Sequence, residues 1–526
     1  MALQPVLIDG GWRVSQASGS FRAENPATRE PLGEEYPVSA WADCDAALSA
    51  AVAAAEALRA APAETIAAFL ERYAERIEGR GGEIVDMAHL ETAYPKSPRL
   101  ADVELPRTTN QLRQAAAAAR DGSWQRATID RQANIRSRHA SIGPVCVFGP
   151  NNFPLAFGSA SGGDFAAAIA AGNPVIAKAN TSHPGTTRLF AEAALAAVGD
   201  VGLHHATVQL IYRTSHADGE RLVADPRVGA TGYTGSRAAG LKLKAAADRA
   251  GKPIYLELSS VNPVVVLPGA LAERREQIAG EFITSVLMGT GQFCTNPGLV
   301  ILLDGGETPA FVAEVAAKFA AAPVGTLLSS GVGKSLSAGV EKLRAAGAEV
   351  LAGGDGGQAG KGYCCPNTLL GTTAAKFVAD SELWQTELFG NASLIVIAKD
   401  ATEAAAVLDC LEGNLTGCIY SDTKGGDDAL YDQLAPRLRP HVGRLLNDKM
   451  PTGVAVSPAM NHGGPYPATG HSGFTAVGIP AAMWRFTVLE CYDNVREHRL
   501  PPALRDKNPT GKMWRSIDGA WTQGDV

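Results

Sequence analysis

Short apolar, β-branched runs alternate with helical segments through most of this 526-residue chain, and that alternation is the feature that most constrains its fold. From ASIGPVCVFGP onward, the runs are PVIAKAN, ATVQLIY, VGATGYTG, PIYLEL and NPVVVLP. Each is continuous and bounded by Gly, Pro or Asn, as is typical of strands that are buried on both faces of a parallel sheet. Strands and helices in alternation predict a doubly wound α/β sheet.

A second series of strands and helices follows Cys294, with the runs LVILL, AEVLAGG, SLIVIAK, TGCIYS and GRLLND. This series predicts a second α/β domain. The first hundred residues have a different texture, because alanine-rich helical segments such as DCDAALSAAVAAAEALRAA fill them. Since 526 residues are too many for a single hydrophobic core, we expect two or three domains.

The composition excludes several classes of protein. Hydrophobic residues make up 46% of the chain, charged residues 19%, and the net charge is −7, which describes a globular protein rather than a disordered, fibrous or nucleic-acid-binding one. No signal-peptide pattern opens the sequence, and Gly, Pro or a charge interrupts every apolar run before membrane-spanning length. We expect a soluble, cytoplasmic protein without membrane or nucleic-acid partners.

The eight cysteines are scattered, and the only close pair, Cys364 and Cys365, is adjacent. Neither a disulfide framework nor a CxxC metal site is indicated. We therefore expect reduced thiols, each either inert or reactive, and no metal.

Two glycine-rich stretches suggest nucleotide binding. GVGKS, at 331–335, resembles the end of a P-loop, but Leu328 stands where the phosphate-wrapping glycine belongs. The GxGxxG fingerprint is also absent from its expected place after a strand. The remaining candidate is VGATGYTGSRAAG, where a strand runs into Gly235 and Ser236 and then a helix whose first N–H groups could bind a pyrophosphate. Helix capping by Ser236 is the alternative.

Four polar residues stand where chemistry could occur. Cys294 lies among small residues in GTGQFCTNPG; a free cysteine is often a core residue, but small neighbours give a nucleophile access to substrate and to backbone N–H groups. Glu257 ends the apolar strand of IYLELSSVNP, where a carboxylate either faces solvent or lines a crevice at the carboxyl ends of the strands. Asn152 in VFGPNNFPLAF either forms a turn or directs an amide into that crevice, and Lys178 ends the apolar strand of PVIAKAN.

Together these residues resemble one family, the NAD(P)-dependent aldehyde dehydrogenases. The resemblance covers nearly the whole chain, through NPATREPLGEEYPVS, GPNNFP, TGYTGS, LELSSVNP, GQFCTNPG and ELFGN. More narrowly, NNFPLAF, GGDFAAAIAAGNPVIAKANTSHPGT, GQFCTNPGLV and PTGVAVSPAMNHGGPYPAT resemble the branch that contains α-ketoglutaric semialdehyde (2,5-dioxopentanoate) dehydrogenases and an NADP-linked fatty aldehyde dehydrogenase.

The resemblance implies an aldehyde-dehydrogenase-like α/β fold with three parts. The first is a Rossmann-type cofactor domain, and the second is an α/β catalytic domain. The third is a small β arm for oligomerisation, which implies a homodimer, or two dimers paired into a tetramer. The expected boundaries are 1–122 and 143–258 for the cofactor domain, 259–478 for the catalytic domain, and 123–142 and 486–526 for the arm.

By the same resemblance, the chain is an enzyme that oxidises an aldehyde to a carboxylate. The Cys294 thiolate attacks the aldehyde, and the Asn152 amide with the Cys294 backbone N–H holds the oxyanion. Hydride transfer to the nicotinamide leaves a thioester, and Glu257 acts as the general base for the water that hydrolyses it.

For the cofactor, the resemblance assigns Lys178 to the adenine-side ribose and Gly235 and Ser236 to the pyrophosphate. Glu387 is assigned to the nicotinamide ribose, with Phe389 packed beside it.

One departure bears on cofactor choice. Many NAD-using members carry Glu three residues after the lysine, and this chain has Thr181. A carboxylate would repel a 2′-phosphate, whereas a hydroxyl can donate to it, so NADP is favoured over NAD. Arg213 is either a second phosphate contact or a surface arginine. Further departures are Ser259-Ser260 in place of Gly-Gly after the base, and Asn391 in place of a proline.

The substrate expected from the branch is α-ketoglutaric semialdehyde, whose carboxylate needs a cation. Arg107 and Arg113 in VELPRTTNQLRQAA are candidates, with a solvated helix face as the alternative, and Phe153 is a further expected substrate contact. A medium or long apolar aldehyde is the competing substrate. A non-catalytic structural relative and a coenzyme A acylating relative are the competing classes. The presence of Cys294, Glu257 and Asn152 together argues against the first, and the base Glu257 argues against the second.

Overall fold

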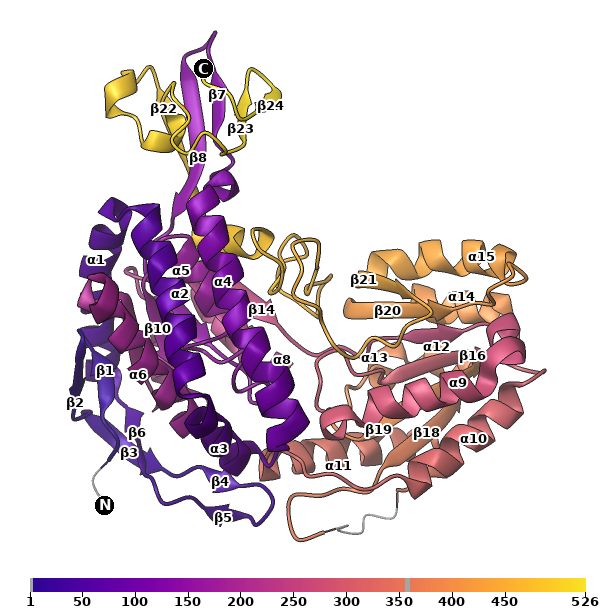
Figure 1. Ribbon diagram of the computed structural model, residues 1–526. Coiled ribbons are helices and arrows are strands. Elements are labelled where there is room, and N and C mark those ends of the chain that lie inside the picture. Colours follow the sequence, from indigo (N-terminus) through magenta and orange to yellow (C-terminus); the bar gives the residue numbers. More distant parts are fainter. Residues whose placement is uncertain (1–2, 355–359) are drawn as a thin grey trace.

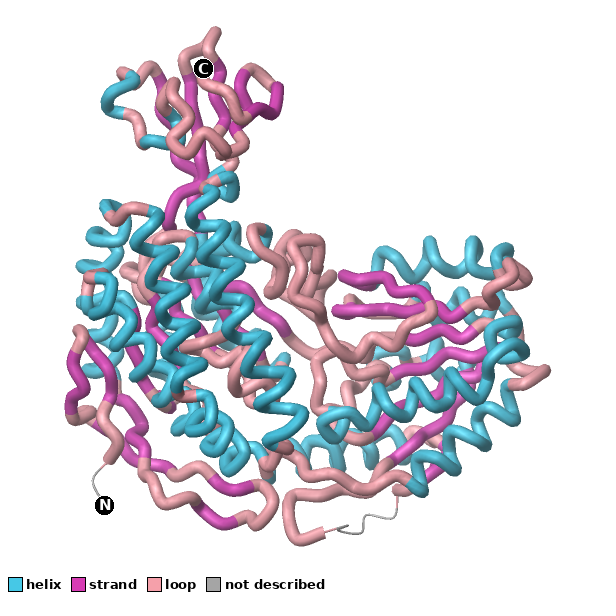
Figure 2. Tube along the Cα trace, in the orientation of Figure 1, coloured by secondary structure: helices cyan, strands magenta, loops and turns pink. Residues whose placement is uncertain are grey.

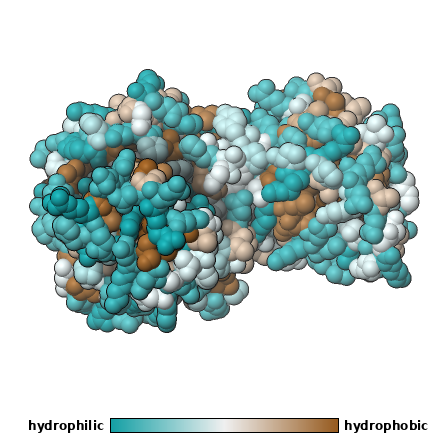
Figure 3. All heavy atoms as spheres, turned by 90° about the horizontal axis from the view of Figure 1, so that it is seen from above, coloured by the Kyte–Doolittle hydropathy of each residue, from teal (hydrophilic) through white to brown (hydrophobic). Residues whose placement is uncertain are grey.

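The computed structural model describes residues 3–354 and 360–526, which form two lobes and a projecting arm (Figures 1 and 2). Each lobe contains a seven-stranded sheet, and the arm contains a five-stranded one. Viewed from above, the surface narrows between the two lobes (Figure 3). Among the helices of the described residues, none combines the length and apolar character that a membrane crossing demands.

The first sheet has the strand order β14-β13-β9-β10-β11-β1-β2. Its five neighbours from β14 to β11 are parallel, as the sequence predicts, and β1 and β2 add an antiparallel edge. That edge is a difference from the sequence analysis, which assigned only helices to the first hundred residues. The strands are β1 Val6–Ile8, β2 Gly11–Arg13, β9 Val145–Phe148, β10 Val175–Lys178, β11 Val208–Ile211, β13 Ala230–Thr234 and β14 Ile254–Glu257.

Helices cover this sheet, and several of them are rich in alanine on the buried face. In α1, Ala47, Ala51 and Ala54 are fully buried, so the helix packs closely through small side chains. The helices are α1 Trp41–Ala60, α2 Ala63–Gly79, α3 Gly81–Thr92, α4 Leu105–Asp121, α5 Gly163–Ala170, α6 Pro184–Val201, α7 His216–Ala224 and α8 Arg237–Arg249. Small additional sheets join β3 Ala17–Phe21, β6 Tyr36–Ser39 and β12 Arg213–Thr214, and β4 Glu24–Asn25 with β5 Glu30–Pro31.

The second sheet has the order β17-β18-β19-β16-β15-β20-β21 and is parallel except at β17. In β15, Val265 enters one core cluster while Val264 and Val266 enter the other, so both faces are buried and the run is continuously apolar. The run NPVVVLP therefore belongs to this sheet. Its strands are β15 Val264–Val266, β16 Leu299–Leu303, β17 Glu349–Ala352, β18 Thr368–Thr373, β19 Ala392–Ala398, β20 Asn414–Tyr420 and β21 Val442–Asn447.

Helices flank the second sheet on both faces (Figure 1). GVGKS lies inside α11, which Ser329 caps by accepting from the Val332 N–H. The sequence is therefore a helix start and not a phosphate loop. The helices are α9 Pro268–Leu287, α10 Thr308–Ala321, α11 Ser330–Ala345, α12 Ala374–Ala379, α13 Ser381–Trp384, α14 Ala401–Asp409 and α15 Asp428–Leu438.

The arm combines two segments that are distant in sequence, as the violet and yellow strands at the top of Figure 1 show. Its strand order is β22-β8-β7-β23-β24, so the small β arm is a five-stranded sheet. The strands are β7 Thr128–Asp130, β8 Ile135–Ser141, β22 Thr487–Asp493, β23 Arg515–Ile517 and β24 Ala520–Thr522.

A segment between the second sheet and the arm returns to the first sheet and lies between the lobes (Figure 1). Ala468 accepts from the Leu258 N–H at 2.8 Å, and Gly470 donates to the Leu256 carbonyl at 3.1 Å. This segment, residues 449–480, is thereby fixed against the carboxyl end of β14.

Candidate active site

The carboxyl ends of the parallel strands place several predicted residues along one edge of the first sheet. Lys178 at the end of β10 is opposite Phe148 and Ile211, and Thr234 at the end of β13 is opposite Glu257 of β14. These neighbouring strand ends border the gap between the lobes, where open α/β sheets bind their ligands.

A cavity of about 640 Å³ opens at this edge, between the first sheet and residues of the second lobe. Predicted residues that line it are Asn152, Gly235, Ser236, Glu257, Cys294, Glu387 and Phe389. Lys178, which ends β10, and Thr181 and Arg213 are not among the residues that line it.

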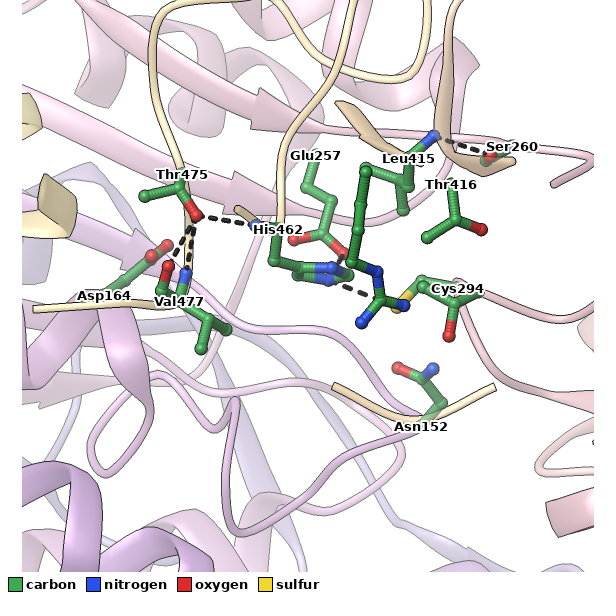
Figure 4. Close-up of polar contacts among 12 residues, drawn as sticks. Asn152, Asp164, Glu257, Ser260, Cys294, Leu415, Thr416, His462, Thr475 and Val477 are labelled. Atoms are coloured by element: carbon green, nitrogen blue, oxygen red, sulfur yellow. Dashed lines mark hydrogen bonds and ion pairs between the residues drawn. The ribbon is translucent and has the colours of Figure 1, made fainter. Parts of the chain in front are cut away.

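Three reactive side chains meet beside the cavity, and two of them, Glu257 and Cys294, line it (Figure 4). The Cys294 sulfur lies 3.4 Å from Nε2 of His462, and the same Nε2 lies 2.9 Å from Oε1 of Glu257. Glu257 and His462 are 3% and 1% exposed. One imidazole therefore bridges the predicted nucleophile and the predicted base.

His462 was not among the residues predicted from the sequence. It lies 168 residues after Cys294, so no local spacing connects the two. The available signal was a lone histidine in NHGGPYPAT, a stretch that carries the resemblance to the branch. Its position is fixed because its backbone N–H donates to Thr475 Oγ1 at 2.7 Å.

The loop that carries Cys294 is held rigidly from both lobes. Asn152, from the first lobe, donates its side-chain amide to the Gln292 carbonyl at 2.9 Å, and Asn262 donates to the Cys294 carbonyl at 2.9 Å. Gly291 has a φ of +70°, and a Cβ there would lie 2.0 Å from the Gly390 carbonyl oxygen. The glycines before the cysteine thus allow the close backbone approach that positions the sulfur.

The electrostatic environment favours the neutral thiol of Cys294. Burial raises its pKa well above the usual value, and the neighbouring Glu257 carboxylate and then the Glu387 charge raise it further. The Arg107 charge acts in the opposite direction. Attack on an aldehyde therefore requires a group that accepts the thiol proton, and His462 is in contact with the sulfur.

Arg107 and Arg113 have different surroundings although both belong to α4. Arg107 is half-buried, donates through Nη1 to the Val454 carbonyl, and lies over the Phe157 ring at 5.4 Å. Its Nε and Nη2 are buried and have no hydrogen-bond partner among the described residues. Arg113 is exposed and forms a two-bond pair with Glu78 at 2.6 and 2.8 Å.

The structure thus does not bring Arg113 to the candidate site. Six residues turn an α-helix by about 600°, which places the two arginines about 120° apart around the axis. The prediction that Arg113 binds the substrate is corrected for that reason: it lies on the solvent-facing side of α4.

Phe153 belongs to an aromatic group beside the nucleophile loop. Its ring lies 5.0 Å from that of Phe293 and 5.3 Å from that of Phe157. Arg99, which the sequence analysis did not identify, lies 4.3 Å from the Phe153 ring centre and donates to the Asn152 carbonyl at 3.2 Å. An ion pair of 2.7 Å with buried Glu104 holds Arg99 in place.

Two of the predicted cofactor residues that line the cavity, Ser236 and Glu387, have a local structure that suits their predicted roles. Ser236 is the N-cap of α8, so the free N–H groups at the start of a 13-residue helix face the cavity. Ser236 therefore caps the helix and also lines the cavity, and the predicted pyrophosphate contact stays a prediction. Glu387 accepts from the Ser260 N–H at 3.1 Å, and burial raises its pKa to about 7.

Lys178 and Arg213 form a pair of cations. Burial and the Arg213 charge lower the pKa of Lys178 to about 8. Within the described residues, no acidic side chain forms an ion pair with either one. Two neighbouring cations without an anion make a fitting site for a phosphate, and half-buried Thr181 follows Lys178 by three residues.

Comparison with known sequences identifies one family. The sequence model of the aldehyde dehydrogenase family matches residues 12–474. The chain is similar to α-ketoglutaric semialdehyde dehydrogenase 2 of Azospirillum brasilense, with 39% identity over 97% of this chain and 98% of that protein. It is also similar to α-ketoglutaric semialdehyde dehydrogenase of Acinetobacter baylyi, with 34% identity over 98% of both chains.

Comparison with solved structures confirms the fold. The crystal structure of PnpE in complex with nicotinamide adenine dinucleotide matches with a TM-score of 0.80 and 22% identity, covering 94% of this chain and 99% of that one. Lactaldehyde dehydrogenase matches with a TM-score of 0.80 and 22% identity over 93% and 99% of the two chains.

Proposed function

The chain belongs to the aldehyde dehydrogenase family, and from this premise we propose that it oxidises α-ketoglutaric semialdehyde to the dicarboxylate with NADP as the oxidant. The names of the two similar proteins support the substrate. The surroundings of Cys294 support thioester chemistry. Arg107, whose charge acts on Cys294, supports an aldehyde that carries a carboxylate.

The observation that carries the substrate assignment is the free edge of Arg107. Nε and Nη2 form one side of a guanidinium, spaced to bind both oxygens of a carboxylate. In Arg107 these two donors are buried without a partner among the described residues, and leaving buried donors unsatisfied costs about 1–3 kcal/mol. A substrate carboxylate would remove that cost, whereas an apolar aldehyde would not.

In the proposed acylation step, neutral His462 carries its proton on Nδ1 and accepts the Cys294 thiol proton at the unprotonated Nε2, while the sulfur attacks the aldehyde carbon. Glu257 Oε1, 2.9 Å from Nε2, stabilises the imidazolium that forms. The Asn152 amide uses one N–H for the Gln292 carbonyl and can donate the second to the developing oxyanion.

In the proposed deacylation step, Glu257 accepts a proton from the water that attacks the thioester. Its Oε2 is buried and lacks a partner among the described residues, which leaves an acceptor for that water. The product is the carboxylate, and the Cys294 thiol is regenerated.

The residues fit NADP. Lys178 and Arg213, the cation pair without an anion, would hold the 2′-phosphate, and the start of α8 at Ser236 would hold the pyrophosphate. Glu387 would hold the nicotinamide ribose. When bound, the nicotinamide accepts the hydride that leaves the substrate carbon. Thr181 supports NADP over NAD because it has no charge to repel the phosphate.

The assembly and the location are further parts of the proposal. We infer that the arm joins two copies of the chain, because Leu489, Trp514 and Trp521 on it are 64%, 48% and 57% exposed. The domain boundaries and the cytoplasmic location expected from the sequence stay predictions.

The test compares two aldehydes and two variants. Arg107→Met should reduce kcat/KM for α-ketoglutaric semialdehyde relative to pentanal by about 10–100-fold, since a hydrogen bond to a charged group contributes about 1.5–3 kcal/mol. The ratio of the two aldehydes cancels the effect of Arg107 on the Cys294 pKa. Arg113→Met is the matched control on the same helix and should leave the ratio unchanged.

Two results would count against the substrate assignment. If Arg107→Met lowered kcat/KM equally for both aldehydes, the arginine would not bind the substrate carboxylate. Preference of the unaltered enzyme for pentanal and longer apolar aldehydes would favour the competing substrate class, which the aromatic group of Phe153, Phe157 and Phe293 could accommodate.

A further inference from the structure

Three side chains from three distant segments converge on one point with three kinds of ligand atom (Figure 4). A carboxylate oxygen of Glu257, Sγ of Cys294 and Nε2 of His462 all lie within 4.8 Å of one another. We propose that this group binds a zinc ion reversibly and that the bound ion inhibits the enzyme.

The spacing of the ligand atoms is close to that of a zinc site. Zinc lies about 2.3 Å from sulfur and about 2.0–2.2 Å from nitrogen or oxygen, so tetrahedral neighbours are about 3.3–3.6 Å apart. Here sulfur and nitrogen are 3.4 Å apart and nitrogen and oxygen 2.9 Å apart. The carboxylate oxygen would have to move slightly away from Nε2 to admit the ion.

One oxygen of the Glu257 carboxylate has no hydrogen-bond donor or cation beside it among the described residues. Oε1 contacts His462, but Oε2 is buried with no hydrogen-bond partner among the described residues. The residue is only 3% exposed, so bulk water does not satisfy this oxygen. A cation between the three side chains would satisfy it.

The kinds of ligand select the metal. One thiolate, one imidazole and one carboxylate suit zinc and disfavour magnesium and calcium, which take oxygen ligands. Three protein ligands leave a fourth tetrahedral position. Cys294 and Glu257 line the cavity, so the ion has an entry path and a water can complete its coordination.

The charges balance when the ion binds. The Cys294 thiol releases its proton and forms a sulfur–zinc bond, so one proton leaves per ion. Two anionic ligands then neutralise the double charge of zinc. Arg107 and Arg444, both electrostatically coupled to Cys294, oppose a bare cation but face a neutral centre once the thiol has ionised.

Zinc and catalysis exclude each other at this site. A zinc-bound sulfur cannot attack an aldehyde, His462 can no longer accept its proton, and Glu257 is no longer free to act as a base. Inhibition rests on the proposed function, whereas binding of the metal does not, so the two can be tested separately.

The experiment titrates chelator-treated full-length protein with Co²⁺, whose bond to a thiolate gives a near-ultraviolet charge-transfer band, and then displaces it with Zn²⁺. We expect about one ion per chain, release of about one proton, and protection of Cys294 from iodoacetamide, followed by mass spectrometry. No aldehyde is needed for these readouts.

Variants locate the ion. Cys294→Ser should abolish the band, and His462→Asn and Glu257→Gln should weaken binding by at least about tenfold. Cys491→Ser, at an exposed thiol on the arm, and His471→Asn, at a histidine outside the group, should behave like the unaltered protein. A band that survives in Cys294→Ser, full affinity in His462→Asn, or undiminished alkylation of the loaded protein would overturn the proposal.

Discussion

At the scale of residues, the Cys294 thiol is acted on by opposing charges. Burial and the Glu257 carboxylate raise its pKa, and Arg107 lowers it. His462 is in contact with both Cys294 and Glu257, so it connects the two half-reactions: it can accept the thiol proton, and the Glu257 carboxylate stabilises the imidazolium that results.

These opposing effects predict a shift in the pH dependence of thiol reactivity. Only the thiolate reacts with iodoacetamide. Glu257→Gln removes the charge that raises the pKa of Cys294, so the midpoint of the alkylation rate should move to lower pH by about one unit. Arg107→Met removes the charge that lowers it, so the midpoint should move to higher pH.

Mass spectrometry of the Cys294 peptide measures these rates without substrate. Glu273→Gln, at an exposed carboxylate bonded to Thr423, is the control and should leave the midpoint unchanged. Shifts in the reverse directions would mean that other groups govern the thiolate.

Three site residues could be predicted from the sequence because each ends a recognisable local pattern. Glu257 ends an apolar strand, Asn152 follows one, and Cys294 stands among glycines that allow close backbone approach. His462 and Arg99 could not be predicted in this way, because their importance arises from contacts across the fold. The contacts of Arg99 with the rings of Tyr94, Phe153 and Phe293 are a tertiary feature.

At the scale of elements, the strand order sets the path of an extended cofactor. Arg213 follows β11, Lys178 ends β10, and Ser236 and Glu257 stand at the ends of β13 and β14. Since neighbouring strands lie about 4.8 Å apart, these residues span about 19 Å along one edge. That span suits a dinucleotide with its phosphate-bearing ribose at Arg213 and its nicotinamide at Cys294.

This arrangement predicts which residue selects the cofactor. Arg213→Ala should lower kcat/KM for NADP by about 10–100-fold, since a charge-assisted contact contributes about 1.5–3 kcal/mol, and should leave kcat/KM for NAD nearly unchanged. Arg221→Ala is the control, because Arg221 is also exposed but lies over the Trp41 ring. Equal losses with both cofactors would remove Arg213 from the phosphate site.

Most strands of both series were predictable because they are continuous apolar runs, such as β9 and β15, which are buried throughout, whereas some elements were not. Strands β1 and β2 are three residues each and too short to show a period against their helical surroundings. On α4, both Arg107 and Arg113 were candidates for the substrate carboxylate, but residues six apart lie on different faces of a helix, and Arg113 takes the solvated position that was the alternative.

At the scale of the whole molecule, the arm exposes apolar side chains on its edge strands. Val488 and Leu489 belong to β22 at one edge, and Trp521 belongs to β24 at the other. They are 43%, 64% and 57% exposed. An unpaired sheet edge with exposed apolar groups favours association with another chain.

The exposed apolar side chains of the arm therefore predict a dimer. A charged residue introduced among them should weaken that dimer. The unaltered protein should have at least twice the chain mass of 54.6 kDa at micromolar concentration, measured by light scattering after size-exclusion chromatography. Leu489→Asp should shift it toward the monomer, and Val14→Asp, at an apolar residue that is 86% exposed outside the arm, should not. A monomeric unaltered protein would contradict this prediction.

The central claim is that Cys294 carries the substrate as a thioester that Glu257 then hydrolyses. The direct test is rapid mixing of Glu257→Gln with NADP and α-ketoglutaric semialdehyde. We predict a burst of about one NADPH per active chain, an acyl group on Cys294 in the mass spectrum, and a steady state slower by about 10²–10⁴-fold. Cys294→Ser should show neither burst nor adduct. Absence of both in Glu257→Gln, or steady turnover at the unaltered rate, would contradict the account.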